Sequence, residues 1–180
     1  ERDCNGIEQQ LTVFVPIDDK VKISIVKLKN NDSIRRKIGL TYYLEPVLGV
    51  NEYFTKQHLV TEYDKDNDVF IIRNGYNNDF PDRIVFMYSS EKIEGFCGDR
   101  YKFLGNGGNK EYPLGLKNDK LEGSVGAGYD PCGAIQIQVK LEAGEEKEIT
   151  FFLGQSLNYE ELKDYATKYS NKNYAKEQLD

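Results

Sequence analysis

The chain has 180 residues and is 39% apolar, with a mean hydropathy of −0.64 and a formal net charge of −6. These values suit one globular domain, or one domain with an appendage, and no apolar run approaches the ~18 residues that a membrane span requires. Because this acidic chain has no basic stripe to offset repulsion from phosphates, we exclude nucleic-acid binding. We also expect no direct membrane contact.

The N-terminal stretch ERDCNGIEQQ has neither the charge pattern nor the apolar segment of a signal peptide. It does not begin with Met, so we expect a fragment of a longer protein. Cys4, Cys97 and Cys132 are odd in number, far apart and without a CxxC pair, which favours reduced thiols. These observations predict a cytoplasmic location.

The first part of the chain alternates apolar and polar side chains with a period of two, as half-buried antiparallel strands do. Apolar residues recur in this way in segments 11–15, 21–28 and 38–44, and the second segment ends at the polar turn Asn30-Asn31-Asp32. The 13 Tyr and 9 Phe also favour strands over helices. We therefore expect sheet from the beginning of the chain.

The middle of the chain continues the pattern and then loses it. His58–Tyr63 and Val69–Ile72 flank the polar turn Asp64–Asp68 and predict a hairpin, and Ile84–Tyr88 is a further apolar run. From Phe96 to Leu121, many Gly and Asn residues predict long loops rather than regular elements.

The C-terminal part predicts one more hairpin and a helix. Segments 135–141 and 149–153 alternate on either side of the turn Ala143-Gly144-Glu145. Asn158 can cap a helix with Glu161 at its third position, and one apolar face follows at helical spacing in Leu162, Tyr165, Ala166 and Tyr169. The predicted fold class is all-β: a two-sheet antiparallel β-sandwich with a short C-terminal helix.

Motifs that would carry chemistry by themselves are weak. Asp64–Asp68 begins like an EF-hand loop, but Val69 and Gly75 stand where that loop needs Gly and Glu. His58 is the only histidine, which excludes a multi-histidine metal site, and we expect it on a strand near the surface. Gly105–Asn109 lacks the Lys-Ser/Thr of a phosphate-binding loop. We predict no metal site and no catalytic residue in this chain.

Tyrosine rings are the remaining candidates for ligand contact, because an aromatic face can pack against the apolar face of a pyranose. Trp is absent. Packing between the sheets is the alternative for each ring. The candidate tyrosines are Tyr43, Tyr53, Tyr76, Tyr101, Tyr112 and Tyr129.

Three stretches taken together resemble a known family. They are LTVFVPIDDKVKISIVKLKNNDSIRRKIGLTYYLEPVLG, GDRYKFLGNGGN and GSVGAGYDPCGAIQIQVKLEAGEEKEITFFLGQ, beginning at Leu11, Gly98 and Gly123. In this order and at these spacings the chain is similar to the N-terminal β-sandwich domain of glycoside hydrolase family 94, the glycoside phosphorylases. It is most similar to the phosphorylase-like C-terminal part of cyclic β-1,2-glucan synthases.

The resemblance implies a galactose-mutarotase-like supersandwich. It implies a sandwich domain at residues 1–155, and at 156–180 a helix and the start of a linker to an absent (α/α)₆ catalytic barrel. No barrel residue is present, so no catalytic residue is carried over and no cofactor is expected for the chain itself. The parent protein would use inorganic phosphate or a sugar phosphate, or would act as a glycosyltransferase. A synthase-type parent would be anchored in the inner membrane by other segments, with this part in the cytoplasm.

The resemblance also selects the loops that would approach the carbohydrate. Relatives carry an Arg-rich segment after the Phe-Leu-Gly, whereas this chain has Asn106-Gly107-Gly108. Arg100 is therefore the best polar candidate. The carbohydrate-proximal candidates are Asp99, Arg100, Tyr101, Asn106, Asn109, Tyr112 and Tyr129.

We accordingly expect a non-catalytic carbohydrate-associated domain that packs on the downstream barrel and helps to shape its β-glucan site. Two alternatives stay open. One is an independent carbohydrate-binding module that uses Tyr101, Tyr112 or Tyr129, and the other is a purely structural domain that forms a homodimer.

Overall fold

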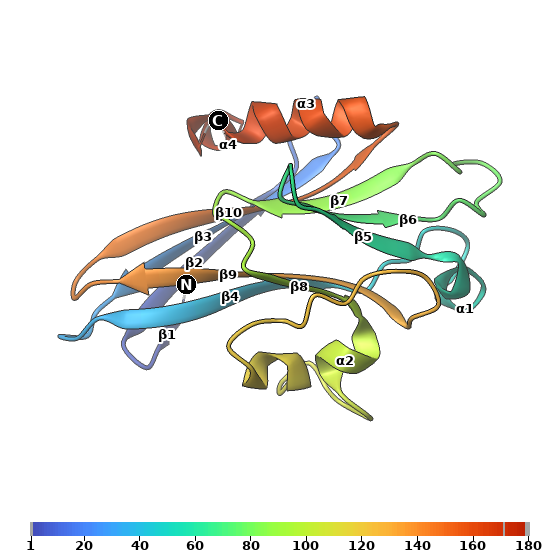
Figure 1. Cartoon of the computed structure of the whole chain (residues 1–180). Coiled ribbons are helices and arrows are strands. Elements are labelled where there is room, and N and C mark those ends of the chain that lie inside the picture. The colour runs from blue at the N-terminus through green and yellow to red at the C-terminus, as the bar shows by residue number, and fades with distance from the viewer. Residues whose placement is uncertain (1, 171, 179–180) are drawn as a thin grey trace.

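The computed structural model describes residues 2–170 and 172–178, which fold mostly into strands (Figure 1). The strands are β1 (Arg2–Cys4), β2 (Ile7–Phe14), β3 (Val21–Asn30), β4 (Arg36–Leu44), β5 (Val60–Asp64), β6 (Val69–Arg73), β7 (Ile84–Ser89), β8 (Gly95–Asp99), β9 (Pro131–Leu141) and β10 (Glu146–Ser156). The helices are α1 (Glu52–Thr55), α2 (Arg100–Leu104), α3 (Tyr159–Ser170) and α4 (Lys172–Glu177), with 3-10 turns η1 (Lys56–His58) and η2 (Leu114–Lys117).

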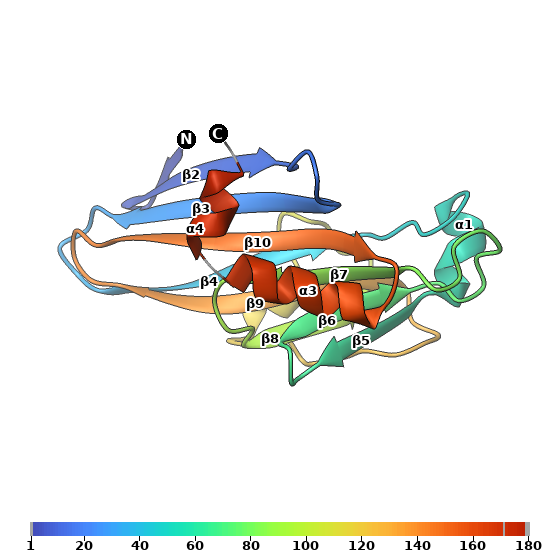
Figure 2. The same ribbon diagram turned by 90° about the horizontal axis from the view of Figure 1, so that it is seen from above.

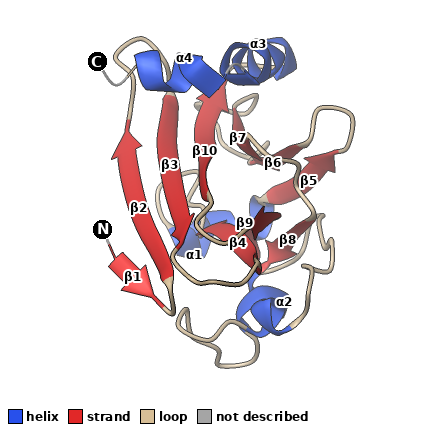
Figure 3. Cartoon of the chain, turned by 90° about the vertical axis from the view of Figure 1, so that its left-hand side faces the viewer, coloured by secondary structure: helices blue, strands red, loops and turns tan. Residues whose placement is uncertain are grey.

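The strands form two antiparallel sheets that face each other. The larger sheet has the order β1-β2-β3-β10-β7-β6-β5, and the smaller has the order β4-β9-β8. Figure 3 shows the larger sheet curving over the smaller one, with α3 on the outer face of the first and α2 beneath the second. The predicted two-sheet antiparallel sandwich with a C-terminal helix is confirmed.

Three apolar clusters hold these layers together. The cluster between the sheets includes Phe70, Met87, Ile135 and Phe151. A second cluster lies between the larger sheet and α3, and a third lies between β8, β9 and α2. Strand β9 contributes to two of these clusters: Ile135 and Ile137 lie in the cluster between the sheets, and Cys132 and Ala134 lie in the cluster beside α2. Its first seven positions are therefore buried, although its second half alternates apolar and polar residues as predicted.

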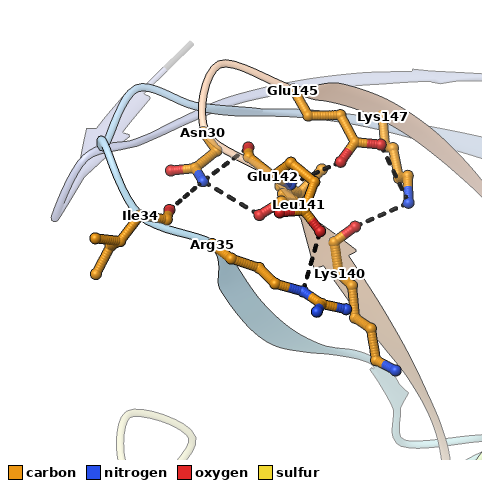
Figure 4. Close-up of polar contacts among 8 residues, drawn as sticks. All are labelled: Asn30, Ile34, Arg35, Lys140, Leu141, Glu142, Glu145 and Lys147. Atoms are coloured by element: carbon orange, nitrogen blue, oxygen red, sulfur yellow. Dashed lines mark hydrogen bonds and ion pairs between the residues drawn. The ribbon is translucent and has the colours of Figure 1, made fainter.

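Two of the connections between the sheets meet at one buried asparagine. The loop from β3 to β4 and the turn from β9 to β10 each pass from one sheet to the other. Asn30, which is fully buried, donates from Nδ2 to the carbonyl oxygens of Ile34, Leu141 and Glu142 at 2.8, 3.2 and 2.9 Å. Figure 4 shows this amide between the two connections, with Arg35 paired to Glu142 beside it. One side chain therefore fastens the two crossovers together.

Helix α3 lies along the outer face of the larger sheet, over β10 and β7 (Figure 2). The predicted cap is confirmed, because Asn158 Oδ1 accepts the Glu161 N–H at 2.9 Å and Glu161 accepts the Leu157 N–H. At the other end, buried Asp19 accepts hydrogen bonds from Lys168 at 2.7 Å and from the Tyr169 hydroxyl at 2.6 Å. Local capping thus begins the helix and a long-range polar contact holds its end. The domain boundary after residue 155 stays a prediction.

Two expectations about the middle of the chain are corrected. His58 is not on a strand: it ends η1, and β5 begins at Val60. The Gly-rich segment from Phe96 is not entirely loop, because β8 pairs with β9 and Asp99 caps α2. In contrast, the hairpin turn Asp64–Asp68 is confirmed, since Asp64 Oδ1 accepts the N–H groups of residues 66 and 67.

Among the described side chains, Cys97 and Cys132 are free and buried, and their reduced state stays a prediction. Cys4 lies outside the described side chains. Within residues 2–170 and 172–178, none of the helices combines the length and apolar character that crossing a membrane would need.

Candidate functional site

The seven predicted site residues gather at α2 and its flanking loops, on the outer face of the smaller sheet (Figure 1). Asp99 is buried at the junction of β8 and α2, where its Oδ1 accepts the N–H of Tyr101 at 3.0 Å. It is the N-cap of α2 and satisfies a donor that the first helical turn leaves unpaired. Its carboxylate therefore has a local structural role.

Arg100 joins α2 to the glycine-rich loop that precedes β9. Its Nε donates to Asp130 Oδ2 at 2.9 Å, and its backbone N–H donates to the Asp130 carbonyl at 2.7 Å. Burial would lower the pKa of the Arg100 guanidinium, but the charge and hydrogen bond of Asp130, together with the charge of Glu45, outweigh it and raise that pKa. The Arg100–Asp130 pair is partly exposed, so the Arg100 guanidinium stays accessible to a ligand.

The aromatic candidates in this region differ in their surroundings. The Tyr129 ring lies 5.8 Å from the Lys102 ammonium, which also donates to Ser124 Oγ at 2.9 Å. Tyr101 and Tyr112 are exposed on the surface. The structure therefore places Tyr129 next to a fixed cation and leaves the other two rings in solvent.

The two asparagine candidates lie on the loop after α2. Asn109 Oδ1 accepts the backbone N–H groups of Glu111 and Tyr112, both at 3.0 Å, so its side chain closes a turn. Asn106 is exposed beside Gly107, whose φ of +62° is one that glycine adopts without strain. The loop thus has one anchored asparagine and one that faces water.

A polar cluster beside α2 was not predicted from the sequence. Tyr43 stacks on Phe103 with ring centroids 4.6 Å apart, and its hydroxyl donates to Glu45 Oε1 at 2.8 Å. Glu45 also pairs with Lys110 at 3.0 Å. Burial would raise the pKa of Glu45, but the hydrogen bonds from Lys110 and Tyr43 outweigh it and hold that pKa below its ordinary value. Only Tyr43 carried a sequence signal, as an aromatic residue.

The two buried thiols beneath α2 share a hydrogen bond, which lowers the pKa of Cys97, and Cys132 does not supply a reactive nucleophile. The hydrogen bond to Cys97 raises the pKa of Cys132, and complete burial raises it further. A thiol in such surroundings stays protonated and inert. What the α2 region offers chemically is a set of fixed charges and ring surfaces.

A second region lies elsewhere on the molecule, where α1 and η1 face the connection between β6 and β7. A groove of about 740 Å³ opens there, and its wall includes Phe54, His58, Tyr76, Phe80 and Arg83. None of the seven predicted site residues lines it. Tyr76 was considered as a sugar platform from the sequence, but nothing in the sequence joined it to the other four.

The ring surfaces of the groove are ordered by contacts with one another. His58 and Tyr76 stack with centroids 4.4 Å apart and ring planes within 7° of parallel. The Arg83 guanidinium lies over the Phe80 ring, 5.5 Å from its centroid. The one feature of the sequence that could have indicated this groove is the Asn- and aromatic-rich stretch NGYNNDF at residues 74–80.

Comparison with known proteins places the fold in a family. Residues 1–172 match the family model described as the glycosyl hydrolase 94 supersandwich domain. The match includes nearly the whole chain, so the chain belongs to this family, as the sequence resemblance implied.

Particular relatives are longer enzymes. The chain is 32% identical over 143 residues to the cyclic beta-(1,2)-glucan synthase NdvB of Rhizobium meliloti, an alignment of 79% of this chain and 5% of that protein. It is 25% identical over 161 residues to the N,N'-diacetylchitobiose phosphorylase of Vibrio proteolyticus, over 84% of this chain and 20% of the enzyme. It is 26% identical over 177 residues to the cellobionic acid phosphorylase of Neurospora crassa, over 93% and 22% respectively. The chain thus spans about a fifth or less of each relative.

Proposed function

We propose that this chain is the non-catalytic N-terminal domain of a larger enzyme of the glycoside phosphorylase or cyclic β-1,2-glucan synthase type. It packs against the catalytic barrel of the same protein and helps to shape a β-glucan site. The observation that carries this proposal is the combination of a family match over residues 1–172 with alignments that include only 5% to 22% of the relatives' lengths.

The side chains around α2 are consistent with a supporting role. Asp99 caps a helix, Arg100 pairs with Asp130, and Asn109 closes a turn. These groups are already engaged in holding loops, whereas bond cleavage by a carboxylate pair needs one group free to donate a proton and another free to attack. The positive end of Arg100 and the exposed ring of Tyr101 are the groups of this face that would meet a substrate held by another domain.

The test compares the 180-residue chain with the full-length protein from which it comes. We expect the chain alone to release no sugar phosphate from β-1,2- or β-1,4-linked glucans in the presence of inorganic phosphate, and to transfer no glucosyl unit. The full-length protein should perform one of these reactions. Turnover by the 180-residue chain alone would refute the proposal.

Variants in the full-length protein test whether the α2 face shapes the site. Arg100→Ala should raise KM for the glucan several-fold with a smaller change in kcat, since binding and not chemistry is altered. Lys117→Ala, an exposed cation in η2, is the matched control and should leave both constants unchanged. Equal effects of the two variants would show that Arg100 has no specific role in shaping the site.

A further inference from the structure

The groove between α1 and the β6–β7 connection displays aromatic side chains that a folded chain usually buries. Tyr76 is 76% exposed, Phe54 is 62% exposed and Phe80 is 55% exposed, and all three line the same 740 Å³ space. Scattered single aromatics on a surface need no explanation, but rings that converge on one groove mark a binding site. The size of the groove is within the range of small-ligand sites.

The loop that carries two of these rings is held by hydrogen bonds to two asparagine side chains. Asn74, which is buried, donates from Nδ2 to the Leu48 carbonyl at 2.7 Å and accepts the Tyr76 N–H at 3.1 Å. Asn77 Oδ1 accepts the N–H groups of Asp79 and Phe80, both at 3.0 Å. Since the backbone on each side of the rings is fixed before any ligand arrives, little conformational entropy remains to be lost on binding.

The stacked rings of His58 and Tyr76 form a flat surface whose orientation is restrained. The parallel stack of His58 and Tyr76 restrains the most exposed ring from one side, and both residues line the groove. Flat apolar faces of this kind match the C–H face of a pyranose, which an irregular protein surface would not match as well.

The polar groups of the groove match the hydroxyl groups of a sugar. Gln57, Asn78 and Gln155 place amides along it, and each amide can both donate to and accept from a hydroxyl. Arg83 adds guanidinium donors, and its Nη1 is buried without a hydrogen-bond partner among the described residues. A purely apolar ligand would leave these groups desolvated and unpaired, which is costly. A ligand with hydroxyls around an apolar ring satisfies both sets of groups.

We propose that this groove is a non-catalytic binding site for a pyranose oligosaccharide, separate from the α2 face. The Tyr76 and Phe80 rings carry sugar units by stacking, and the amides and Arg83 select hydroxyl positions. The site is built entirely from residues of this chain, so it does not depend on the barrel or on the role proposed for α2. It gives the domain a glycan affinity of its own.

Titration of the 180-residue chain with linear β-1,2- and β-1,4-gluco-oligosaccharides, followed by NMR chemical shifts and calorimetry, tests this inference. We expect saturable binding of at least one series, with the largest shifts at residues 54–58 and 74–83. Tyr76→Ala should weaken binding about tenfold, equivalent to ~1.4 kcal/mol, because a stacking face is removed. Tyr76→Phe keeps the ring and should bind nearly as well as the unaltered chain.

Leu11→Ala is the matched control, because Leu11 is 62% exposed on β2 and does not line the groove. It should leave glycan affinity unchanged, and urea midpoints should show that each variant is folded. Flat titrations with both series would overturn the inference, as would equal losses in Tyr76→Ala and Leu11→Ala. The inference would also be overturned if another polypeptide segment covered the groove in the full-length protein and the isolated chain bound no glycan. Turnover by the isolated chain would refute the proposed function while leaving this binding result intact.

Discussion

Replacing Asn30 by alanine should be one of the most damaging polar substitutions in the chain. The fully buried Nδ2 donates to three carbonyl oxygens at 2.8–3.2 Å, and Oδ1 accepts the Asp32 N–H at 3.1 Å (Figure 4). The amide nitrogen has two hydrogens, so two of the three carbonyls share one of them, and three hydrogen bonds at about 0.5–1.5 kcal/mol net each amount to ~1.5–4.5 kcal/mol. The Ile34 and Glu142 carbonyls are only partly buried and can regain water, which favours a loss of about 3 kcal/mol.

Equilibrium unfolding in urea measures this effect. We expect Asn30→Ala to lower the free energy of unfolding by about 3 kcal/mol without a change in m-value, and to lower the Tm by ~6–12 °C for a domain of this size. Asn31→Ala is the control, because Asn31 is exposed and makes one exposed hydrogen bond to Glu8 at 3.3 Å. It should change stability by less than about 0.5 kcal/mol.

Asn30→Asp separates the donated hydrogen bonds from side-chain volume. At pH 7 it places a charged acceptor against three carbonyl oxygens, so it should destabilise more than Asn30→Ala does. A loss below about 1 kcal/mol for Asn30→Ala, or equal losses at positions 30 and 31, would refute the reasoning that this amide fastens the two crossovers.

Three further predictions concern packing, helix docking and pH. Gly98→Ala should cost about 1–3 kcal/mol, because its Cβ would lie 2.2 Å from the Thr61 hydroxyl oxygen; Gly75→Ala, which meets nothing within 4 Å, should be nearly neutral in the same urea titration. Asp19→Ala should leave the Tyr169 hydroxyl without its buried acceptor and should therefore speed amide hydrogen exchange selectively in α3. Uniform acceleration of exchange across both sheets would contradict the role of Asp19 in docking this helix. The contribution of the buried tyrosines to stability should be constant below about pH 10 and fall above it, because burial raises their folded-state pKa while the unfolded chain still ionises near 10. A stability curve that is flat to pH 11 would contradict this sign. The tyrosines concerned are Tyr43, Tyr63, Tyr88 and Tyr169.

The elements that were predicted correctly depend on local chemistry. Strands β3 and β10 show alternation because successive side chains point to opposite faces whatever the partner strand is. The beginning of α3 was predicted because the Asn158 cap uses residues within one turn of it. Such signals need no knowledge of what lies across the fold.

The elements that were missed depend on distant residues. Strand β8 lies in a Gly-rich segment with a weak strand signal, and it forms because β9, more than thirty residues later, supplies its hydrogen bonds. Gly98 there is explained by the approach of Thr61 from β5, which no spacing within the sequence reveals. Among the predicted site residues, Asp99 and Asn109 proved to hold local turns, while their closeness to carbohydrate stays a prediction.

By itself the sequence determined the fold class, the hairpins, the helix cap and, through its resemblance, the family. The tertiary structure alone decided where ring surfaces converge and which polar groups are buried. His58 and Tyr76 stack although a whole hairpin separates them, and Asn30 bonds to a carbonyl 111 residues away. Periodicity records which face of an element a side chain occupies, but contacts between elements arise only when the sheets close on each other.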